Sequence, residues 1–189
     1  METDTIFDFY TDSFELPDGS YVNCEIMDTG GQEEFDSQNR LYYKRADCCL
    51  LVYDITNKDS FNSVKNFYIK EISNNCIKDI KVILLGNKTD LKNQRKISHK
   101  DGANLASKHK FVFMETSCEE NYNVRDAFET IILMTNSEMI RTGKLNESKS
   151  EDKVGLINEE ENNEIFIIND DNLKKDVKKQ KKKNKKNCC

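Results

Sequence analysis

Three short segments carry side chains that could bind a nucleotide. Residues 28–33 read DTGGQE, residues 86–91 read GNKTDL, and residues 114–118 read METSC. Each follows a run of residues that is typical of a β-strand. In open α/β sheets, ligands bind outside the carboxyl ends of the strands. The shared setting therefore predicts one site that is built from three loops.

The first segment suits phosphate and metal chemistry. Asp28 could hold Mg²⁺ through water, and Gly31, which has no side chain, would let a backbone N–H approach a terminal phosphate. Gln32 could orient a water molecule that attacks that phosphate. A glycine-rich turn after a strand explains the same residues equally well, so the segment alone does not decide its role.

The second segment suits recognition of a guanine base. The carboxylate of Asp90 could accept hydrogen bonds from N1 and N2 of guanine, a donor pair that adenine lacks. Asn87 could tie neighbouring loops together, and the stem of Lys88 could lie over the base. The alternative is a capped turn that opens an ordinary surface loop.

The third segment is the weakest of the three signals. Ser117 would share the pocket with Asp28 and Asp90, and the backbone N–H of Cys118 could donate to O6 of guanine. A structural turn that uses Ser and Thr hydroxyls is the simpler interpretation of this segment alone.

The elements that must position these loops alternate between strands and helices. The turn at residues 17–20 and the alternation at residues 22–26 predict a hairpin over residues 11–27. Unbroken apolar runs predict buried parallel strands, and helical spacing predicts the segments between them. The predicted strands are 48–53, 82–85 and 111–114, and the predicted helices are 58–74, 99–108 and 122–139. This order predicts an α/β fold with a parallel sheet.

Charge is distributed unevenly along the 189 residues. The net charge is −5, but residues 174–189 hold nine Lys and one acid, whereas residues 1–173 hold 20 basic and 33 acidic residues. An acidic body would repel nucleic acid, which we therefore do not expect as a partner. Residues 141–189 have the composition of a disordered tail.

The seven cysteines favour a reducing compartment. Their number is odd, no CxxC occurs, and the N-terminal residues do not resemble a secretory signal. Cys24, Cys48, Cys49 and Cys76 are expected in the core. His99 and His109 stand apart, so we expect no His/Cys metal site.

Together the three segments resemble the small GTPases of the Ras superfamily, over roughly residues 5–135. The resemblance is nearest to the Rab branch, through Phe35 and Ser37, LYYKRA at 41–46, LVYDITN at 51–57, Ser60, Phe61 and Val64. It implies a Ras-like three-layer fold over residues 1–140 that binds GTP or GDP with Mg²⁺ and hydrolyses GTP with the help of Gln32. Thr5, in a stretch similar to the switch motif T-I-x-D, would contact Mg²⁺; another alignment places Asp4 there.

The last two residues, Cys188 and Cys189, resemble the double-cysteine end of Rab proteins, which receives two geranylgeranyl groups. Two lipid chains and a Lys-rich approach would anchor the protein to the cytoplasmic face of a membrane, from which it would cycle to the cytosol. The resemblance implies a monomer in vesicle traffic that binds effectors, an exchange factor, a GTPase-activating protein, an escort protein and a GDP-dissociation inhibitor. The apolar residues 165–168 could form the patch gripped by the escort protein or a loose hydrophobic segment.

One departure from the family is large, because the phosphate-binding motif G-x-x-x-x-G-K-[ST] is absent from the sequence. By resemblance, the first strand, that loop and the first helix are missing, and the neighbouring strands would face a gap. The leading hypothesis is a Rab-like GTPase whose recorded sequence lacks its first residues. The alternative is a membrane-tethered interaction module that no longer binds nucleotide.

Overall fold

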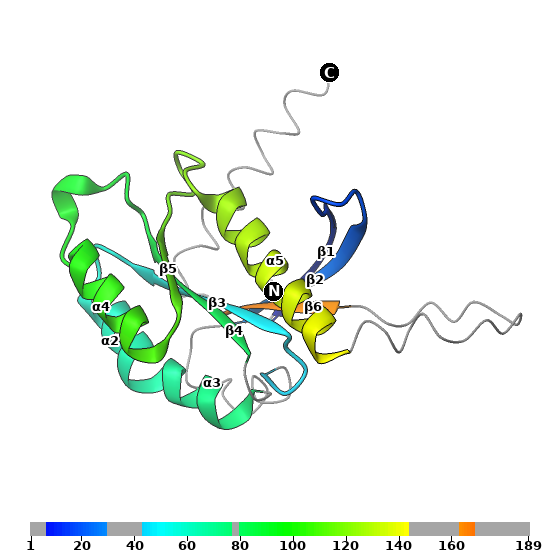
Figure 1. Cartoon of the computed structure of the whole chain (residues 1–189). Helices are drawn as coiled ribbons and strands as arrows, with labels where there is room; N and C mark the ends of the chain where they lie inside the picture. Colours follow the sequence, from blue (N-terminus) through cyan, green and yellow to red (C-terminus); the bar gives the residue numbers. More distant parts are fainter. Residues whose placement is uncertain (1–6, 30–42, 77–79, 144–162, 169–189) are drawn as a thin grey trace, which may run out of the picture.

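The computed structural model describes residues 7–29, 43–76, 80–143 and 163–168 (Figure 1). These residues form one six-stranded sheet in the order β1-β2-β6-β3-β4-β5. Only the pairing of β1 with β2 is antiparallel; every other neighbouring pair is parallel. The strands are β1 (Phe7–Glu15), β2 (Tyr21–Thr29), β3 (Cys48–Asp54), β4 (Lys81–Asn87), β5 (Val112–Glu115) and β6 (Asn163–Ile168).

A tight turn joins β1 to β2. Gly19 has φ of +80°, a left-handed conformation that residues with a Cβ rarely adopt. The backbone N–H of Leu16 donates to Ser20 O at 2.8 Å, and Asp18 Oδ1 accepts from the backbone N–H of Ser20 at 3.0 Å. The predicted hairpin is confirmed, with longer strands than the alternation indicated.

Helices cover both faces of the sheet, which gives three layers (Figure 1). One face is covered by α2 (Lys58–Ser63), a π-helical turn η2 (Val64–Tyr68), α3 (Ile69–Asn75) and α4 (His99–His109). The other is covered by α5 (Val124–Thr142). None of the helices within the described residues is both long and apolar enough to cross a membrane.

Local capping fixes where two of these helices begin. The Asn57 side chain accepts from the backbone N–H of Asp59 at 2.9 Å, at the start of α2. Ser98 and Asp101 form a reciprocal capping box at the start of α4. Both arrangements pair backbone N–H groups that a helix start would otherwise leave unpaired.

Strand β3 forms the centre of the core. All seven of its residues are buried, so its side chains pack alternately on the two helical layers. Leu51 and Tyr53 lie in the cluster under α2, η2, α3 and α4, whereas Cys48 and Leu50 lie in the cluster under α5. Cys24, Cys48 and Cys49 are buried as predicted, and Cys76 is partly buried.

The α/β fold and the order of its elements are confirmed, but the sheet differs from the expectation in one respect. The expected gap beside β2 and β3 is not present, because β6 lies between them and pairs with both. Residues 163–168 thus form a strand within the segment expected to be a disordered tail. The division into residues 1–140 and 141–189 stays a prediction, since residues 144–162 and 169–189 lie outside the described part.

Candidate functional site

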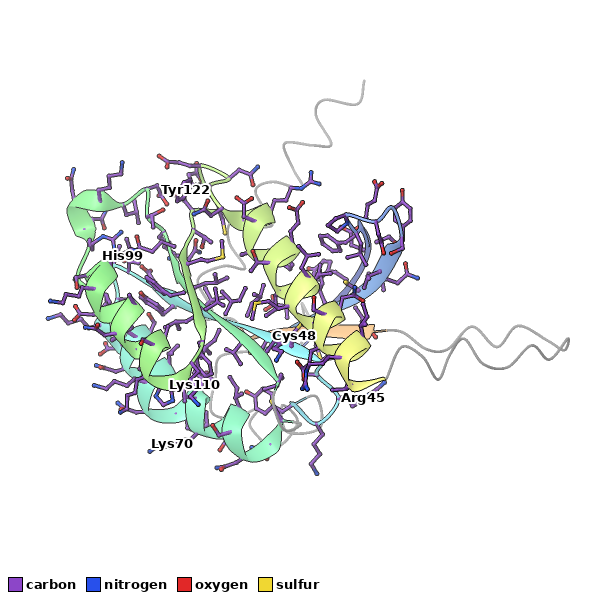
Figure 2. All side chains as sticks on the ribbon, viewed as in Figure 1. Arg45, Cys48, Lys70, His99, Lys110 and Tyr122 are labelled. Carbon is purple, nitrogen blue, oxygen red and sulfur yellow. The ribbon has the colours of Figure 1, made fainter. Side chains whose placement is uncertain are left out.

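The loops that follow β4 and β5 meet at one edge of the sheet. Because β2, β6, β3, β4 and β5 are parallel, their carboxyl ends lie along this edge. Figure 2 labels Tyr122 there, on the loop from β5 to α5. The edge holds Asn87, Lys88, Asp90, Ser117 and Cys118, the five predicted base-binding residues.

Asn87 is the centre of this arrangement. It ends β4, is 2% exposed, and its Oδ1 accepts from Thr116 Oγ1 at 3.2 Å and from Cys118 Sγ at 3.7 Å. The backbone N–H of Thr116 donates to Gly86 O at 2.9 Å. Asn87 therefore ties the two loops together, as the sequence indicated.

The backbone changes direction at Lys88, directly after the end of β4. Its φ of +70° is left-handed, which is unusual for a residue with a side chain and costs about 1 kcal/mol. The next residue offsets this cost, because both the backbone N–H and the hydroxyl of Thr89 donate to Thr116 O at 3.1 Å. This reversal brings Asp90 next to the second loop.

Asp90 and Ser117 form a direct contact. The Ser117 hydroxyl donates to Asp90 Oδ1 at 2.7 Å and accepts from the backbone N–H of Glu120 at 3.1 Å. Ser117 is fully buried, and its backbone pairs with Tyr122. The Ser117 hydroxyl is thus bonded on two sides and restrains the carboxylate of Asp90. A carboxylate restrained in this way could accept a pair of N–H donors.

Asp54, at the end of β3, belongs to the same edge although the sequence interpretation did not include it. Its carboxylate accepts from the backbone and the hydroxyl of Thr56 at 2.7 Å each and pairs with Lys88 Nζ at 2.9 Å. Burial alone would raise the pKa of Asp54, but the hydrogen bonds from Thr56 and the ammonium group of Lys88 hold it below its ordinary value. The sequence signal that could have identified Asp54 is its position, because it is an acidic residue that directly follows the apolar run 48–53.

A second unpredicted pair supports the end of β5. Arg95 Nη1 and Nη2 donate to the two carboxylate oxygens of Glu115 at 2.6 and 3.0 Å, and Arg95 Nη1 also donates to Ile97 O at 3.2 Å. A two-point Arg–carboxylate contact fixes geometry as well as charge. It holds the strand end from which Thr116 and Ser117 continue.

Gly86 cannot carry a side chain at the base of the site. A Cβ there would lie 2.8 Å from the Tyr53 hydroxyl and 3.3 Å from a methyl group of Ile55. The missing side chain lets β4 approach β3 at this point, and the loop starts from a closely packed floor.

Asp28 lies farther along the same edge. It is the penultimate residue of β2 and is paired in register with Ile167 of β6. Strands β6 and β3 separate β2 from β4, so three strand spacings, roughly 14 Å, lie between Asp28 and the base-binding loops. A ligand that contacted both would have to be extended along the edge.

The remaining predicted site residues lie outside the described residues. They are Thr5, Gly31, Gln32, Cys188 and Cys189. Within the residues that the structure describes, no group of three or more His, Cys, Asp or Glu side chains could hold a metal ion by itself.

The fold and its edge define the class of protein: a three-layer α/β protein with two hydrogen-bonded polar loops at the carboxyl ends of its strands. Comparison with known proteins gives the family, since residues 1–137 match the Ras family. Human Ras-related protein Rab-8B is 37% identical over 155 residues, 82% of this chain and 73% of the relative. Bovine Rab-8A is 40% identical over 124 residues, 66% of this chain and 59% of the relative. The chain belongs to the Ras family and is a small GTPase homologue of the Rab type.

Proposed function

We propose that the chain recognises guanine nucleotides through Asp90 and acts as a Rab-like switch. The observation that carries this proposal is the 2.7 Å hydrogen bond from Ser117 to Asp90, within two loops joined by Asn87. A carboxylate fixed in this way suits the N1 and N2 donors of guanine and has no matching donor pair on adenine. Family membership supports GTP or GDP with Mg²⁺ as the ligand.

The other residues would act on the phosphate part of the nucleotide. Asp28 and Thr5 would contact Mg²⁺, the backbone of Gly31 would meet the terminal phosphate, and Gln32 would orient the attacking water. The ammonium group of Lys88 pairs with Asp54, and the methylene stem of Lys88 would then be free to cover the base. Cys118 would donate its backbone N–H to O6 of guanine.

Changing Asp90→Asn tests base recognition directly. Asn replaces one acceptor by an NH₂ donor, which opposes N2–H₂ of guanine but matches the carbonyl that xanthine carries at the same position. We expect the affinity for GTP, measured by calorimetry with Mg²⁺, to fall at least 100-fold and the affinity for xanthosine triphosphate to rise. The control is Asp12→Asn, an exposed position on β1.

Two outcomes would contradict guanine recognition. Equal loss of GTP and xanthosine triphosphate binding in a folded Asp90→Asn variant would mean that Asp90 supports the loop but does not read the base. A preference of the unchanged chain for ATP over GTP would exclude the site as described.

We further propose that Cys188 and Cys189 receive geranylgeranyl groups and anchor the protein to the cytoplasmic face of a membrane. The terminal position of the cysteine pair and the nine Lys of residues 174–189 support this. In this role the protein would serve vesicle traffic and bind Rab effectors and regulators: an exchange factor, a GTPase-activating protein, an escort protein and a GDP-dissociation inhibitor. Mass spectrometry of the C-terminal peptide from eukaryotic cells tests it, and an unmodified peptide in the membrane fraction would contradict it.

A second function has one observation in its favour. The sequence contains no G-x-x-x-x-G-K-[ST], so the nest of backbone N–H groups and the Lys that grip the phosphates in the family have no counterpart. A chain of this kind would be a membrane-tethered interaction module without nucleotide. Micromolar or tighter binding of Mg²⁺-GTP to the purified chain would exclude it.

A further inference from the structure

Strand β6 occupies the interior of the sheet although it comes from near the end of the chain. It lies between β2 and β3 and is parallel to both (Figure 1). Six of its residues pair with Cys24–Thr29 of β2, and four of them, Ile165–Ile168, pair with Cys48–Leu51 of β3. Within the described residues, β6 is the strand that links the two halves of the sheet by backbone pairing, and the hairpin also packs against β3 and α5.

A strand in the position between β2 and β3 has to pair with both neighbours, and β6 does so. Without a strand there, β2 and β3 would each present a row of unpaired backbone groups, next to residues as buried as Cys48 and Leu50. A strand with partners on both sides should be apolar without alternation. Residues 165–168 read IFII, which is such a run, rich in β-branched side chains.

The end of α5 and the start of β6 lie at the same edge of the sheet. Lys81, the first residue of β4, pairs with Glu138 near the end of α5 at 3.1 Å, so α5 ends at the amino edge of the strands. Strand β6 begins at that same edge, with Asn163 opposite Cys24. The 19 residues 144–162 therefore connect two points at one edge.

We propose that β2 and β3 form a strand-binding groove whose occupant is Asn163–Ile168 of the same chain. The segment completes the sheet as its third strand, and the fold depends on it. While it is bound there, its backbone groups are paired with β2 and β3 and are withheld from other partners, including any escort protein that would grip residues 165–168. Release of the segment would open the sheet between β2 and β3.

Hydrogen–deuterium exchange of the full chain, analysed by mass spectrometry, tests the groove. The peptide that contains residues 163–168 should exchange at least 100-fold more slowly than the intrinsic rate of an unstructured peptide, because its amides are bonded in a sheet interior. Exchange at the intrinsic rate under conditions where β3 and β4 are protected would overturn the proposal.

A proline substitution tests how far the fold depends on the strand. Ile167→Pro removes a ladder N–H in the sheet interior and should lower Tm by more than about 10 °C. Ile167→Val, which keeps the backbone N–H at the same position, is the matched control and should lower Tm much less. Equal Tm values for the two variants would overturn the proposal.

A cross-link tests the register. Asn163 is paired with Cys24, and directly paired positions in parallel strands lie about 4.8 Å apart at Cα, within disulfide range. Oxidation of the Asn163→Cys variant should join position 163 to Cys24, as detected by peptide mapping, and the product should disappear when Cys24 is changed to Ser. A yield no higher than that of a Glu164→Cys control, whose position pairs with Glu25 instead of Cys24, would overturn the proposal.

Discussion

The base-binding loops and the centre of the sheet are built in different ways. The loops are joined by hydrogen bonds between the ends of two neighbouring strands, β4 and β5, with Asn87 and Ser117 as the bonded side chains. The centre depends on β6, which enters from about 20 residues beyond α5. One region is thus complete within residues 81–123, and the other needs a distant segment.

This difference means that, in the proposed function, recognition of the base and tight binding of the nucleotide would depend on different regions. In the proposed function, base recognition uses Asp90 and the contacts that hold it, and these contacts come from the first region. The strand position beside Asp28 on the phosphate side is supplied by β6. The contacts that are proposed to distinguish guanine from adenine therefore lie in one region, and the strand beside Asp28 lies in the other.

The largest effect should come from the sheet centre. Leu51→Ala removes a fully buried side chain on β3, opposite Ile168 on one side and Leu84 on the other, and should cost about 3 kcal/mol of unfolding free energy in urea. Leu133→Ala, at a side chain 39% exposed, is the control and should cost much less. If the folded fraction of Leu51→Ala also lost its preference for GTP over ATP, the two regions would not be independent.

The next effect should come from the link between the loops. Asn87→Ala leaves the Thr116 hydroxyl without its buried acceptor and should cost about 2 kcal/mol, with faster amide exchange at residues 116–118. Asn104→Ala, an exposed position on α4, should change neither quantity. Unchanged exchange in Asn87→Ala would show that the loops are held by their backbones alone.

A smaller effect should follow from the hydroxyl that fixes Asp90. Ser117→Ala removes one hydrogen bond to a carboxylate and should weaken GTP binding about tenfold, with little effect on the protection of β6. Ser107→Ala, exposed on α4, is the control. Calorimetry gives the affinity, and an unchanged value would mean that Asp90 is held without Ser117.

The smallest effect should appear at alkaline pH, again in the sheet centre. Burial raises the pKa of the Cys48 thiol from an ordinary value of 9.0 to about 12, so the folded state keeps a proton that the unfolded state loses. Stability is then fully present below pH 9 and falls as pH rises toward 12, by about 1 kcal/mol between pH 9 and 10. Urea midpoints at these two pH values measure the whole pH dependence. Cys48→Ala should remove only the share of Cys48, because burial also raises the pKa of Cys24 to about 11 and of Cys76 to about 12.

Local patterns predicted most of the fold and the two polar loops that follow β4 and β5. The apolar run at 48–53 predicted β3 because a short, unbroken apolar run suits a strand that is buried on both faces. The polar residues after 82–85 predicted the loop that holds Asp90. The π-helical turn at Val64–Tyr68 was not predicted, because residues 58–74 fit ordinary helical spacing. Asp54 was missed because its partners, Thr56 and Lys88, become neighbours only when β3 and β4 pair.

Strand β6 was missed for a different reason. Four apolar residues in a segment rich in Asn, Glu and Asp do not specify a strand by themselves, and the position they take exists only once β2 and β3 have formed. The sequence predicted a gap beside those strands, and this was wrong because residues 163–168 pair with both of them.

The direction of β6 has a consequence for how the protein would face a bilayer. Because β6 runs parallel to β3, the chain leaves the body at Ile168 on the edge that bears Asp90, and not at the far edge where α5 ends beside Lys81. A lipid on Cys189 would then anchor the protein with the proposed nucleotide site on the side that faces the membrane. Regulators would have to reach that side of the protein close to the membrane surface.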